Sequence, residues 1–509
     1  MSQPSPNILL IMADQLAPQF TGTYGHPVVK TPHMDALAAR GARFDAAYCN
    51  SPLCAPSRFS FMSGQLITRI AAYDNASDFP ASIPTFAHYL RTMGYKTCLS
   101  GKMHFVGPDQ LHGFEERVTT DVYPADYGWT PDWEHADDRF DKWYHNMDSV
   151  REAGVAATTF QLDYDDEVAF FAKRKIFEYA CNESQPFCLV ASFTHPHDPY
   201  VAPPAWWNLY DPADIDLPKI TLSRDVQDPL SQRIMDGIKA NIDIASEEEI
   251  RNSRHAYYAN TSYFDTKVGE LVQALEQAEL LDNTIVIVTA DHGEMLGERS
   301  LWYKMNFFEH SVRVPLIIAG PTIQQRTITN ACSLVDLLPT MVDIAAMDGT
   351  EKPAYGQPID GHSLLPFATG SDDTFDEAIG EYCAEMTSYP VYMIRRGRYK
   401  YIHCETDAPL LFDLIQDPDE LFNIATHSDY TNAATEFATE IADRWNSETI
   451  RQDVIKSQKQ RRAVHLAMET GTLTSWDYNP TRDASQEYVR NHIAWTVAAG
   501  KTRFPPFKR

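Results

Sequence analysis

Over residues 7–350, segments with the hydrophobic pattern of a strand alternate with segments that have the hydrophobic pattern of a helix. Asn7–Ala13 and Asn283–Ala290 are continuous apolar runs, which is typical of strands buried on both faces of a sheet. Asp165–Cys181 and His255–Leu280 instead repeat their apolar residues at helical spacing. Because strands and helices follow one another in turn, this part of the chain predicts an α/β fold, with a doubly wound, mainly parallel sheet flanked by helices.

Shorter segments continue the same alternation. Proline in a first turn and glycine after a last turn mark helix ends, because proline lacks the N–H that the first turn leaves unpaired. We therefore expect a helix and a returning segment at Thr31–Phe44, a helix from Ser82 to just before Gly94, a helix at Leu334–Met347, and strands at Lys96–Ser100, Phe187–Phe193 and Val314–Ala319.

The pattern changes near residue 375, where we place a domain boundary. Short apolar segments close together predict an antiparallel meander, and two amphipathic stretches follow them. The expected strands are Ala378–Glu385, Val391–Arg395, Tyr399–His403 and Leu410–Leu414, and the expected helices are Ala433–Trp445 and Ser447–Met468.

The chain thus divides into a larger α/β domain at 1–375, a smaller α+β subdomain at 376–469 and an extended tail at 470–509. The tail has too few apolar residues to fold alone, so we expect it to lie on its own domain or at a subunit interface. Residues 107–160 are a long loop insertion without periodicity. Long loops in compact domains are usually functional or disordered, and the aromatic residues Trp129, Trp133, Trp143 and Tyr144 argue against disorder.

Composition limits the partners of the chain. It carries 43 Lys+Arg against 70 Asp+Glu, a net charge of −27, which makes nucleic acid and anionic membranes poor partners. A site for an anionic substrate must therefore be locally basic. The N-terminal segment lacks the basic region of a signal sequence, no stretch is long enough to span a membrane, and the eight cysteines form no CxxC pair. We expect a cytoplasmic protein with reduced thiols.

Chemically active side chains follow several of the predicted strands. Asp14 follows the first strand, Lys102 and His104 follow Lys96–Ser100, and Asp291-His292 follows Asn283–Ala290. In open α/β sheets ligands bind at the carboxyl ends of the strands. Asp14 is therefore a candidate metal ligand, although an aspartate that caps the next segment is an equally good interpretation.

Cys54-Ala55-Pro56-Ser57-Arg58 is the stretch with the clearest chemical meaning. Pro56 suits the first turn of a helix, and Arg58, four residues after Cys54, shares its face. A sulfur at a helix N-terminus beside a guanidinium lies in an electropositive place that suits developing negative charge. A buried cysteine beside a structural ion pair is the alternative interpretation.

Cys-x-Pro-x-Arg, followed by Ser63-Gly64, resembles the signature of the formylglycine-dependent sulfatases of the alkaline phosphatase superfamily. The resemblance covers nearly the whole chain. It implies an alkaline-phosphatase-like fold and an enzyme that hydrolyses a small sulfate ester. It also implies that a formylglycine-generating enzyme converts Cys54 to 3-oxoalanine, whose hydrated aldehyde is the nucleophile.

The resemblance also implies a metal site. Asp14, Asp291, His292 and an oxygen on residue 54 would bind a hard divalent cation. Many sulfatases have Asp-Asp where this chain has Asp14-Gln15, and Asn where it has His292. We expect Ca²⁺, with Mg²⁺ or Mn²⁺ as alternatives, and these departures make Mn²⁺ more credible.

Carried over residue by residue, the family pattern implies five further catalytic positions. Arg58 and Lys102 would hold the formylglycine hydroxyl, and His104 would be the base that removes a proton from the remaining hydroxyl. His197 and Lys304 would hold sulfate oxygens and protonate the departing alcohol. His195 competes with His197, but Pro196-His197-x-Pro199 is the closer match to the family.

The stretch from Ser475 to Asn491 resembles the members of the family that act on choline-O-sulfate. A quaternary ammonium cannot donate a hydrogen bond, so its recognition needs an aromatic face and a nearby anion. Trp129 is the candidate face and Glu385 the candidate anion, with Glu381 as its rival. Asn75 and His145 are candidates for polar contacts to the sulfate and the ester oxygen. We expect a homo-oligomer, a dimer or tetramer, in which Asp477 or Asp483 of the tail adds charge from a neighbouring subunit.

Two alternatives stay open at this point. The first is a phosphonate monoester or phosphodiester hydrolase of the same superfamily, which also uses formylglycine and tolerates Asp-Gln and Asp-His at the metal positions. The second is a protein without catalysis that binds sulfated or quaternary ammonium solutes, if Cys54 stays unmodified.

Overall fold

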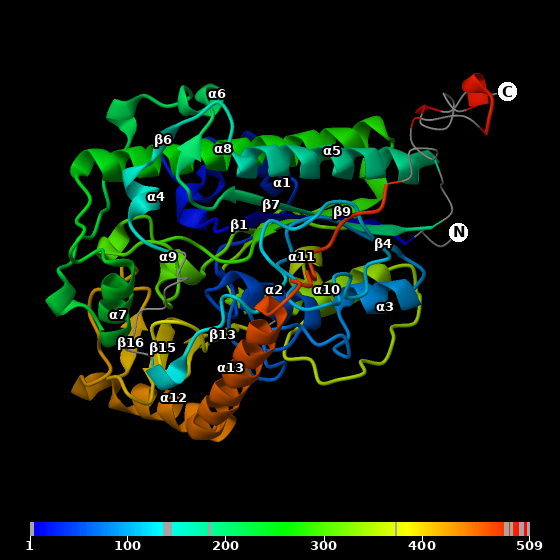
Figure 1. Ribbon diagram of the computed structural model, residues 1–509. Coiled ribbons are helices and arrows are strands. Elements are labelled where there is room, and N and C mark those ends of the chain that lie inside the picture. Colours follow the sequence, from blue (N-terminus) through cyan, green and yellow to red (C-terminus); the bar gives the residue numbers. More distant parts are fainter. Residues whose placement is uncertain are drawn as a thin grey trace.

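The computed structural model describes residues 5–135, 145–181, 185–371, 374–482, 488, 492–497 and 503–505. Its centre is an eight-stranded sheet with helices on both faces (Figure 1). The strand order is β11 (Arg326–Ile328), β2 (Gly41–Phe44), β10 (Leu316–Ala319), β9 (Thr284–Ala290), β1 (Asn7–Asp14), β7 (Phe187–Pro196), β4 (Lys96–Gly101) and β5 (Glu116–Arg117).

Most neighbouring strands of this sheet run parallel, as the sequence predicts. β1 pairs in parallel with β7 and with β9, and every residue of β1 is buried. β10 is an exception, because it runs antiparallel to both β9 and β2. Its apolar sequence, like that of its parallel neighbours, carries no sign of its direction, since a strand buried on both faces has the same pattern either way.

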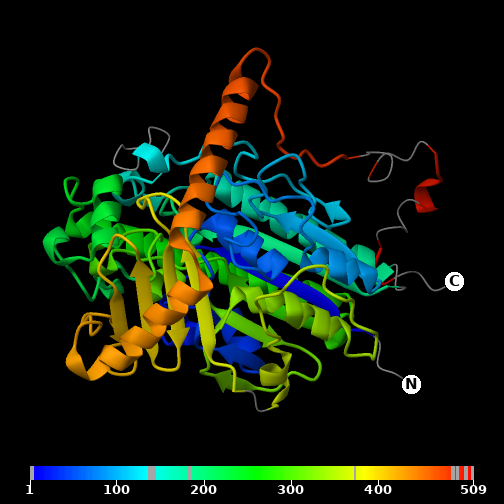
Figure 2. The same cartoon turned by 90° about the horizontal axis from the view of Figure 1, so that it is seen from below.

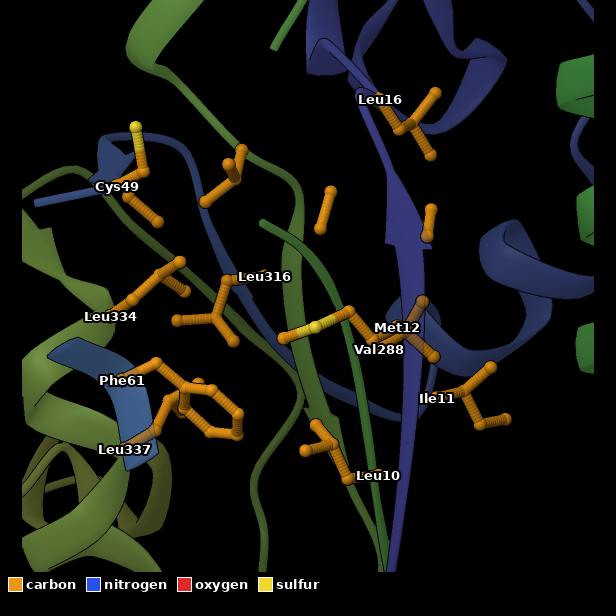
Figure 3. Close-up of a cluster of buried hydrophobic side chains, with 14 of the residues drawn as sticks. Leu10, Ile11, Met12, Leu16, Cys49, Phe61, Val288, Leu316, Leu334 and Leu337 are labelled. Carbon is orange, nitrogen blue, oxygen red and sulfur yellow. The ribbon is translucent and has the colours of Figure 1, made fainter. Parts of the chain in front are cut away.

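Helices cover the two faces of the sheet in separate groups (Figure 1). α5 (Phe160–Cys181) and α8 (Glu247–Gln277) lie on one face, and α2 (Cys54–Ser63), α3 (Phe86–Thr92) and α10 (Leu337–Ala345) lie on the other. Leu10 and Met12 of β1 point toward Phe61 and Leu337, whereas Ile11 points to the opposite face (Figure 3). Because successive side chains of a strand point to opposite faces, β1 contributes buried side chains to the packing against both helical layers.

The helices predicted from periodicity are present, with shifted ends. α8 begins eight residues before the predicted His255, where Ser246 and Glu249 form a capping box. α5 begins at Phe160 instead of Asp165, and α3 begins after Thr85, so that Pro84 precedes the helix. Capping contacts between side chain and backbone, and not apolar spacing, determine these starts.

The predicted antiparallel meander is confirmed. It consists of β13 (Glu377–Tyr382), β14 (Val391–Arg396), β15 (Tyr399–Cys404) and β16 (Leu410–Asp413), followed by α12 (Thr431–Arg444) and α13 (Ser447–Glu469). α12 packs on this sheet through a small separate core. α13 crosses the body of the protein, and its last turns extend beyond it (Figure 2).

After α13 the tail returns to the main domain. The Tyr478 hydroxyl donates a hydrogen bond to the carbonyl of Arg117, and Asp477 accepts one from the amide of Ala125. The tail therefore contacts the 107–160 insertion of its own chain. Within the described part of the insertion only short elements form, and Trp143 and Tyr144 lie outside the described residues.

The remaining elements are short. They are the strands β3 (Ala47–Tyr48), β6 (Gly154–Val155), β8 (Val201–Ala202) and β12 (Cys332–Ser333), and the helices α1 (Pro32–Ala38), α4 (Asp148–Arg151), α6 (Pro204–Trp207), α7 (Pro229–Ile238), α9 (Glu309–Val312) and α11 (Leu365–Thr369). Among the described helices, none combines the length and the apolar character needed to cross a membrane.

Candidate active site

Four side chains that can bind a metal meet at the carboxyl ends of the central strands. Asp14 ends β1, Asp291 and His292 follow β9, and Cys54 is the first residue of α2. One potential ligand atom from each lies within 4.8 Å of the others. Cys54 Sγ lies 3.2 Å from His292 Nε2 and 3.8 Å from Asp14 Oδ1. The structure thus brings together the four residues for which the sequence predicts metal binding.

Local structure explains this meeting. Ala13 of β1 is paired in register with Ala290 of β9, so the residues that follow leave the sheet side by side. α2 begins at Cys54 because Leu53 is extended and Pro56 fits the first turn. The side chain of Asn75 accepts a hydrogen bond from the amide of Ala55 at 3.0 Å, which fixes the start of the helix. Asn75, predicted to touch sulfate, therefore also supports Cys54.

Arg58 and Lys102 contact the carboxylates of this cluster. Arg58 Nε donates to Asp291 Oδ2 at 2.8 Å, and its Nη1 donates to the Lys102 carbonyl at 2.7 Å. Lys102 Nζ donates to Asp14 Oδ2. Burial would raise the pKa of Asp14, but the charges of Lys102, His197 and Arg58 hold that pKa well below its usual value. Asp14 is therefore ionised and ready to bind a cation.

The thiol of Cys54 does not behave as its helix position suggests. Burial, and then the charge of Asp14, raise its pKa to about 11, and the charges of Lys102 and Lys304 do not compensate. The expected stabilisation of negative charge by the helix N-terminus and Arg58 is therefore wrong for the thiol itself. Because a protonated thiol is a poor nucleophile, an unmodified Cys54 is poorly suited to catalysis.

His197, which directly follows β7, and Lys304 form a second group of side chains. His197 Nε2 lies 3.0 Å from Lys304 Nζ, and its Nδ1 faces the carbonyl oxygen of Asp198 at 2.7 Å. Burial and the charge of Lys304 lower the pKa of His197 well below its usual value. The rival His195 instead binds Asp165 of α5 at 2.6 Å, which gives it a structural role.

His104 is held in an uncommon backbone conformation. Its φ angle is 60°, and the amides of Met103 and His104 both donate to Asp121 Oδ2 at 3.0 Å. Asp121 in turn binds Arg117 at 2.6 Å. Burial and the charge of Lys102 lower the pKa of His104 well below its usual value, so the ring is neutral and able to accept a proton.

Trp129 and His145, both in the long insertion, lie beside these histidines. The Trp129 ring is 5.9 Å from that of His104. His145 stacks on Tyr303 with ring centroids 4.3 Å apart and lies 6.2 Å from His197. The structure therefore places both predicted substrate-binding residues beside predicted catalytic histidines.

Glu385 and its rivals have very different surroundings. Glu385 is 6% exposed, and neither carboxyl oxygen has a hydrogen-bond partner among the described residues. Glu381 accepts hydrogen bonds from the amide and hydroxyl of Thr68, both at 2.8 Å, and from Trp445 Nε1 at 2.5 Å. Asp477 binds the amide of Ala125, and Asp483 lies outside the described residues. Of the described candidates, Glu385 is the one free to bind a ligand.

Several residues of the site were missed by sequence reasoning. Gln15 accepts a hydrogen bond from Lys304 and donates to Asp198 and Glu294. Tyr123 places its ring 4.1 Å from Lys102 Nζ. Gln15 is adjacent to Asp14 and could have been found by that position, whereas Tyr123 lies in an insertion whose path the sequence does not determine.

The donor set fits a divalent cation. It offers two carboxylates, one imidazole nitrogen and the side chain of residue 54, which suits a hard cation best when residue 54 supplies oxygen. Arg58, Lys102 and Lys304 make the surroundings cationic although the whole chain has a net charge of −27. The site is therefore locally basic, as an anionic substrate requires.

Comparison with known proteins gives consistent matches. The family model Sulfatase matches residues 6–347, the model "N-sulphoglucosamine sulphohydrolase, C-terminal" matches 297–447, and "Choline sulfatase enzyme C terminal" matches 452–504. The chain is 46% identical over 515 residues to a choline-sulfatase of Rhizobium meliloti (strain 1021), covering 99% of both chains. It is 30% identical over 455 residues to arylsulfatase K of Homo sapiens, covering 83% of this chain and 79% of the relative.

Solved structures show the same fold. A phosphonate monoester hydrolase of Agrobacterium radiobacter matches with a TM-score of 0.69 and 23% identity, covering 94% of this chain and all of that chain. A 2-O GAG sulfatase matches with a TM-score of 0.68 and 23% identity, covering 94% and 95%. The predicted alkaline-phosphatase-like α/β architecture is confirmed.

Proposed function

The chain belongs to the sulfatase family, and on that premise we propose that it hydrolyses choline-O-sulfate to choline and sulfate by breaking the S–O bond. Identity of 46% over the full length to a choline-sulfatase supports this substrate, as does the match of residues 452–504 to a choline sulfatase C-terminal model. The proposal is that the two ends of a zwitterionic ester bind two distinct parts of one site.

The observation that carries the proposal is the connection between these two parts. The cationic cluster suits a sulfate, and Glu385, whose carboxyl oxygens have no hydrogen-bond partner among the other described residues, suits an ammonium. Asp74 and Asn75 join them: Asn75 binds the amide after Cys54, and Asp74 is the charge that most affects the pKa of Glu385. A small molecule with a sulfate at one end and a cation at the other matches this charge pattern.

Cys54 enters this proposal as 3-oxoalanine, formed by a formylglycine-generating enzyme. With its pKa raised to about 11, the thiol itself would be almost fully protonated at neutral pH. Asp14, Asp291 and His292 would hold the divalent cation together with residue 54, with Ca²⁺ as the proposed ion and Mg²⁺ or Mn²⁺ as alternatives. When bound, the cation would supply a Lewis acid for a sulfate oxygen and would acidify the hydrated aldehyde.

The remaining roles belong to side chains of the chain itself. Arg58 and Lys102 donate hydrogen bonds to Asp291 and Asp14 and would also orient the hydroxyls of residue 54. His104 would accept a proton on a ring nitrogen, because burial keeps the ring neutral. Lys304 and His197 would hold sulfate oxygens and give a proton to the departing alcohol, which an alkyl leaving group needs.

Four residues would bind the substrate outside the reacting atoms. Trp129 would offer its ring face to the quaternary ammonium, worth roughly 0.5–2 kcal/mol, and Glu385 would supply the opposite charge. Asn75 and His145 would contact the sulfate and the ester oxygen. We further propose that the working enzyme is a homo-oligomer, a dimer or tetramer, with the tail at a subunit interface.

Side-by-side turnover assays test the function. The enzyme, with conversion of Cys54 verified by intact mass, should hydrolyse choline-O-sulfate far faster than an aryl phosphonate monoester. In ¹⁸O-labelled water the label should appear in the released sulfate. A large preference for the phosphonate would favour the alternative hydrolase, and label in choline would show that the C–O bond breaks. An unmodified Cys54 together with no turnover would favour a solute-binding protein.

A further inference from the structure

Glu385 is a buried acidic residue whose position is fixed by its backbone. The side chain is almost fully buried, and neither carboxyl oxygen has a hydrogen-bond partner among the other described residues. Its backbone is held on both sides: Tyr382 donates to the Glu385 carbonyl at 2.9 Å, and Trp133 Nε1 donates to the Ala384 carbonyl at 2.8 Å. Buried carboxylates without hydrogen bonds or a paired cation are costly, so this group needs either a proton or a ligand.

Among the described residues, the charged groups around Glu385 do not supply a free cation. Arg461 of α13 uses Nη1 and Nη2 on Asp74, at 2.6 and 2.7 Å, so its charge is already matched. Lys304 contacts Gln15 and His197. Burial, and next the charge of Asp74, raise the pKa of Glu385 to about 8, against smaller opposite effects of its own backbone amide, Lys304 and Arg461. At neutral pH the empty protein therefore carries a protonated Glu385.

From this arrangement we propose that Glu385 forms a proton-exchanging cation subsite, in which an entering quaternary ammonium takes the place of the carboxyl proton. The carboxylic acid and the free cation become a carboxylate–ammonium pair, and one proton leaves to solvent. No covalent bond other than O–H breaks, and charge is conserved. The inference rests on the proposed function for the class of cation, and it adds that substrate and product binding are linked to proton release.

The linkage has a direct consequence for affinity. A cation that binds only the ionised carboxyl must first displace the proton, so its observed affinity should rise about tenfold per pH unit below the pKa and level off above it. The exchange also explains how an anionic subsite can stay buried without a ligand. The neutral acid avoids most of the desolvation cost that a bare carboxylate would bear.

Isothermal titration calorimetry with tetramethylammonium chloride tests the proposal. The probe has neither an exchangeable proton nor a sulfate ester, so any proton that appears in buffer comes from the protein. Titrations of the converted, metal-loaded enzyme in phosphate and in Tris buffer at pH 7 should differ in heat by an amount that corresponds to release of about one proton per bound cation. The release should vanish above pH 9. Absence of binding, or binding with no buffer dependence at pH 7, would overturn the proposal.

Two variants sharpen the experiment. Glu385→Gln should bind tetramethylammonium more weakly, with no proton release and little dependence on pH. Glu381→Gln is the matched control, because Glu381 is also buried and near the end of β13 but has its oxygens hydrogen-bonded. It should release protons as the unaltered enzyme does. If Glu385→Gln does not fold, the titration of the unaltered enzyme still decides.

The outcomes separate this inference from the proposed function. Proton release with tetramethylammonium but no hydrolysis of choline-O-sulfate would support the subsite and reject the function. Hydrolysis of choline-O-sulfate together with tetramethylammonium binding that releases no proton would support the proposed function and reject the proton-exchanging subsite.

Discussion

Arg461 of α13 forms a buried, two-bonded ion pair with Asp74, 387 positions earlier in the chain. The same guanidinium lies 3.3 Å from the hydroxyl of Thr130. Asp74 precedes Asn75, and Thr130 follows Trp129, so one side chain ties together the segments that carry two proposed substrate-binding residues. The C-terminal helix therefore helps to position the proposed substrate-binding segments from within its own chain.

Replacing Arg461 by Met should damage both stability and substrate binding. It would leave the buried charge of Asp74 unpaired, which costs about 3–5 kcal/mol in comparable cases. We expect that loss in urea unfolding, together with a KM for choline-O-sulfate raised at least about tenfold, more than for 4-nitrophenyl sulfate.

Arg462→Met is the matched control for that change. Arg462 is half-buried and binds Asp132 and the Pro131 carbonyl, and exposed pairs of this kind contribute at most about 1 kcal/mol. Compared with Arg461→Met, Arg461→Lys should regain part of the lost stability, but its KM should stay closer to that of Arg461→Met than to that of the unaltered enzyme. The reason is that one ammonium cannot make both hydrogen bonds to Asp74. Equal effects of Arg461→Met on the two substrates would show that Arg461 stabilises the fold without positioning the pocket.

The sequence predicted those parts of the fold and site that depend on local pattern. Continuous apolar runs marked β1 and β9, and polar residues directly after them gave Asp14 and Asp291, because the ends of parallel strands share one edge. Arg461 and Tyr123 could not be found in this way. Their roles depend on how α13 and the insertion pack against distant segments, which periodicity does not encode.

The same limit applies to electrostatics. The position of Cys54 at a helix start beside Arg58 indicated a stabilised anion, yet burial and Asp14 dominate and raise the pKa of the thiol. The sequence favoured Glu385 over its rival Glu381 only because Glu385 lies at the end of the predicted strand. Only the hydrogen bonds from Thr68 and Trp445 separate them, and these come from elements far away in the chain.

Cys54→Ala should abolish turnover and retain substrate binding. The change removes the proposed nucleophile but leaves Arg58, Lys102 and Lys304 to hold the sulfate. We expect sulfate release to fall to the uncatalysed background, while equilibrium binding of choline-O-sulfate stays within about tenfold. Cys188→Ala, at a buried cysteine within β7, is the control and should keep full activity. Turnover retained by Cys54→Ala would exclude residue 54 as the nucleophile.

Trp129→Ala should reduce activity selectively for the cationic substrate. A lost cation–π contact of roughly 0.5–2 kcal/mol corresponds to an about 2- to 30-fold loss in kcat/KM for choline-O-sulfate. Hydrolysis of 4-nitrophenyl sulfate, which lacks the cation, should change less than about twofold. Trp207→Ala, where the ring stacks on His255 instead, serves as the control. Similar losses for both substrates would mean that the indole supports His104 and not the ammonium.

Removal of the divalent metal should abolish activity without unfolding the protein. Lys102 and Arg58 already contact Asp14 and Asp291, so these carboxylates keep a partner when no metal is bound. After chelation we expect near-complete loss of turnover, a cooperative thermal transition that is still present, and recovery on addition of Ca²⁺ or Mn²⁺. Asp291→Asn should show the same loss without recovery. Full activity in a sample shown by elemental analysis to be metal-free would contradict the metal role.

The protonation of Glu385 predicts how stability depends on pH in the absence of a ligand. In the folded protein burial and Asp74 raise the pKa of this carboxyl from its usual 4.5 to about 8, so the folded state binds the proton more tightly than the unfolded state does. The stabilising effect is complete below pH 4.5 and is lost as the pH rises toward 8. Other buried carboxyls, such as Asp336 with a pKa of about 7, give the same trend, and Glu385→Gln isolates one contribution.

Between pH 6 and pH 9 the unaltered protein should therefore lose about 2–3 kcal/mol more free energy of unfolding than Glu385→Gln, as measured by urea titration without added cation. Saturating tetramethylammonium should reduce this difference, because the cation stabilises the ionised carboxylate that the high pH produces. If the free energy of unfolding changed with pH in the same way for the unaltered protein and Glu385→Gln, Glu385 would already be ionised at pH 6. In that case the carboxyl would have to be paired inside the empty protein, and the bound cation would have no proton to displace.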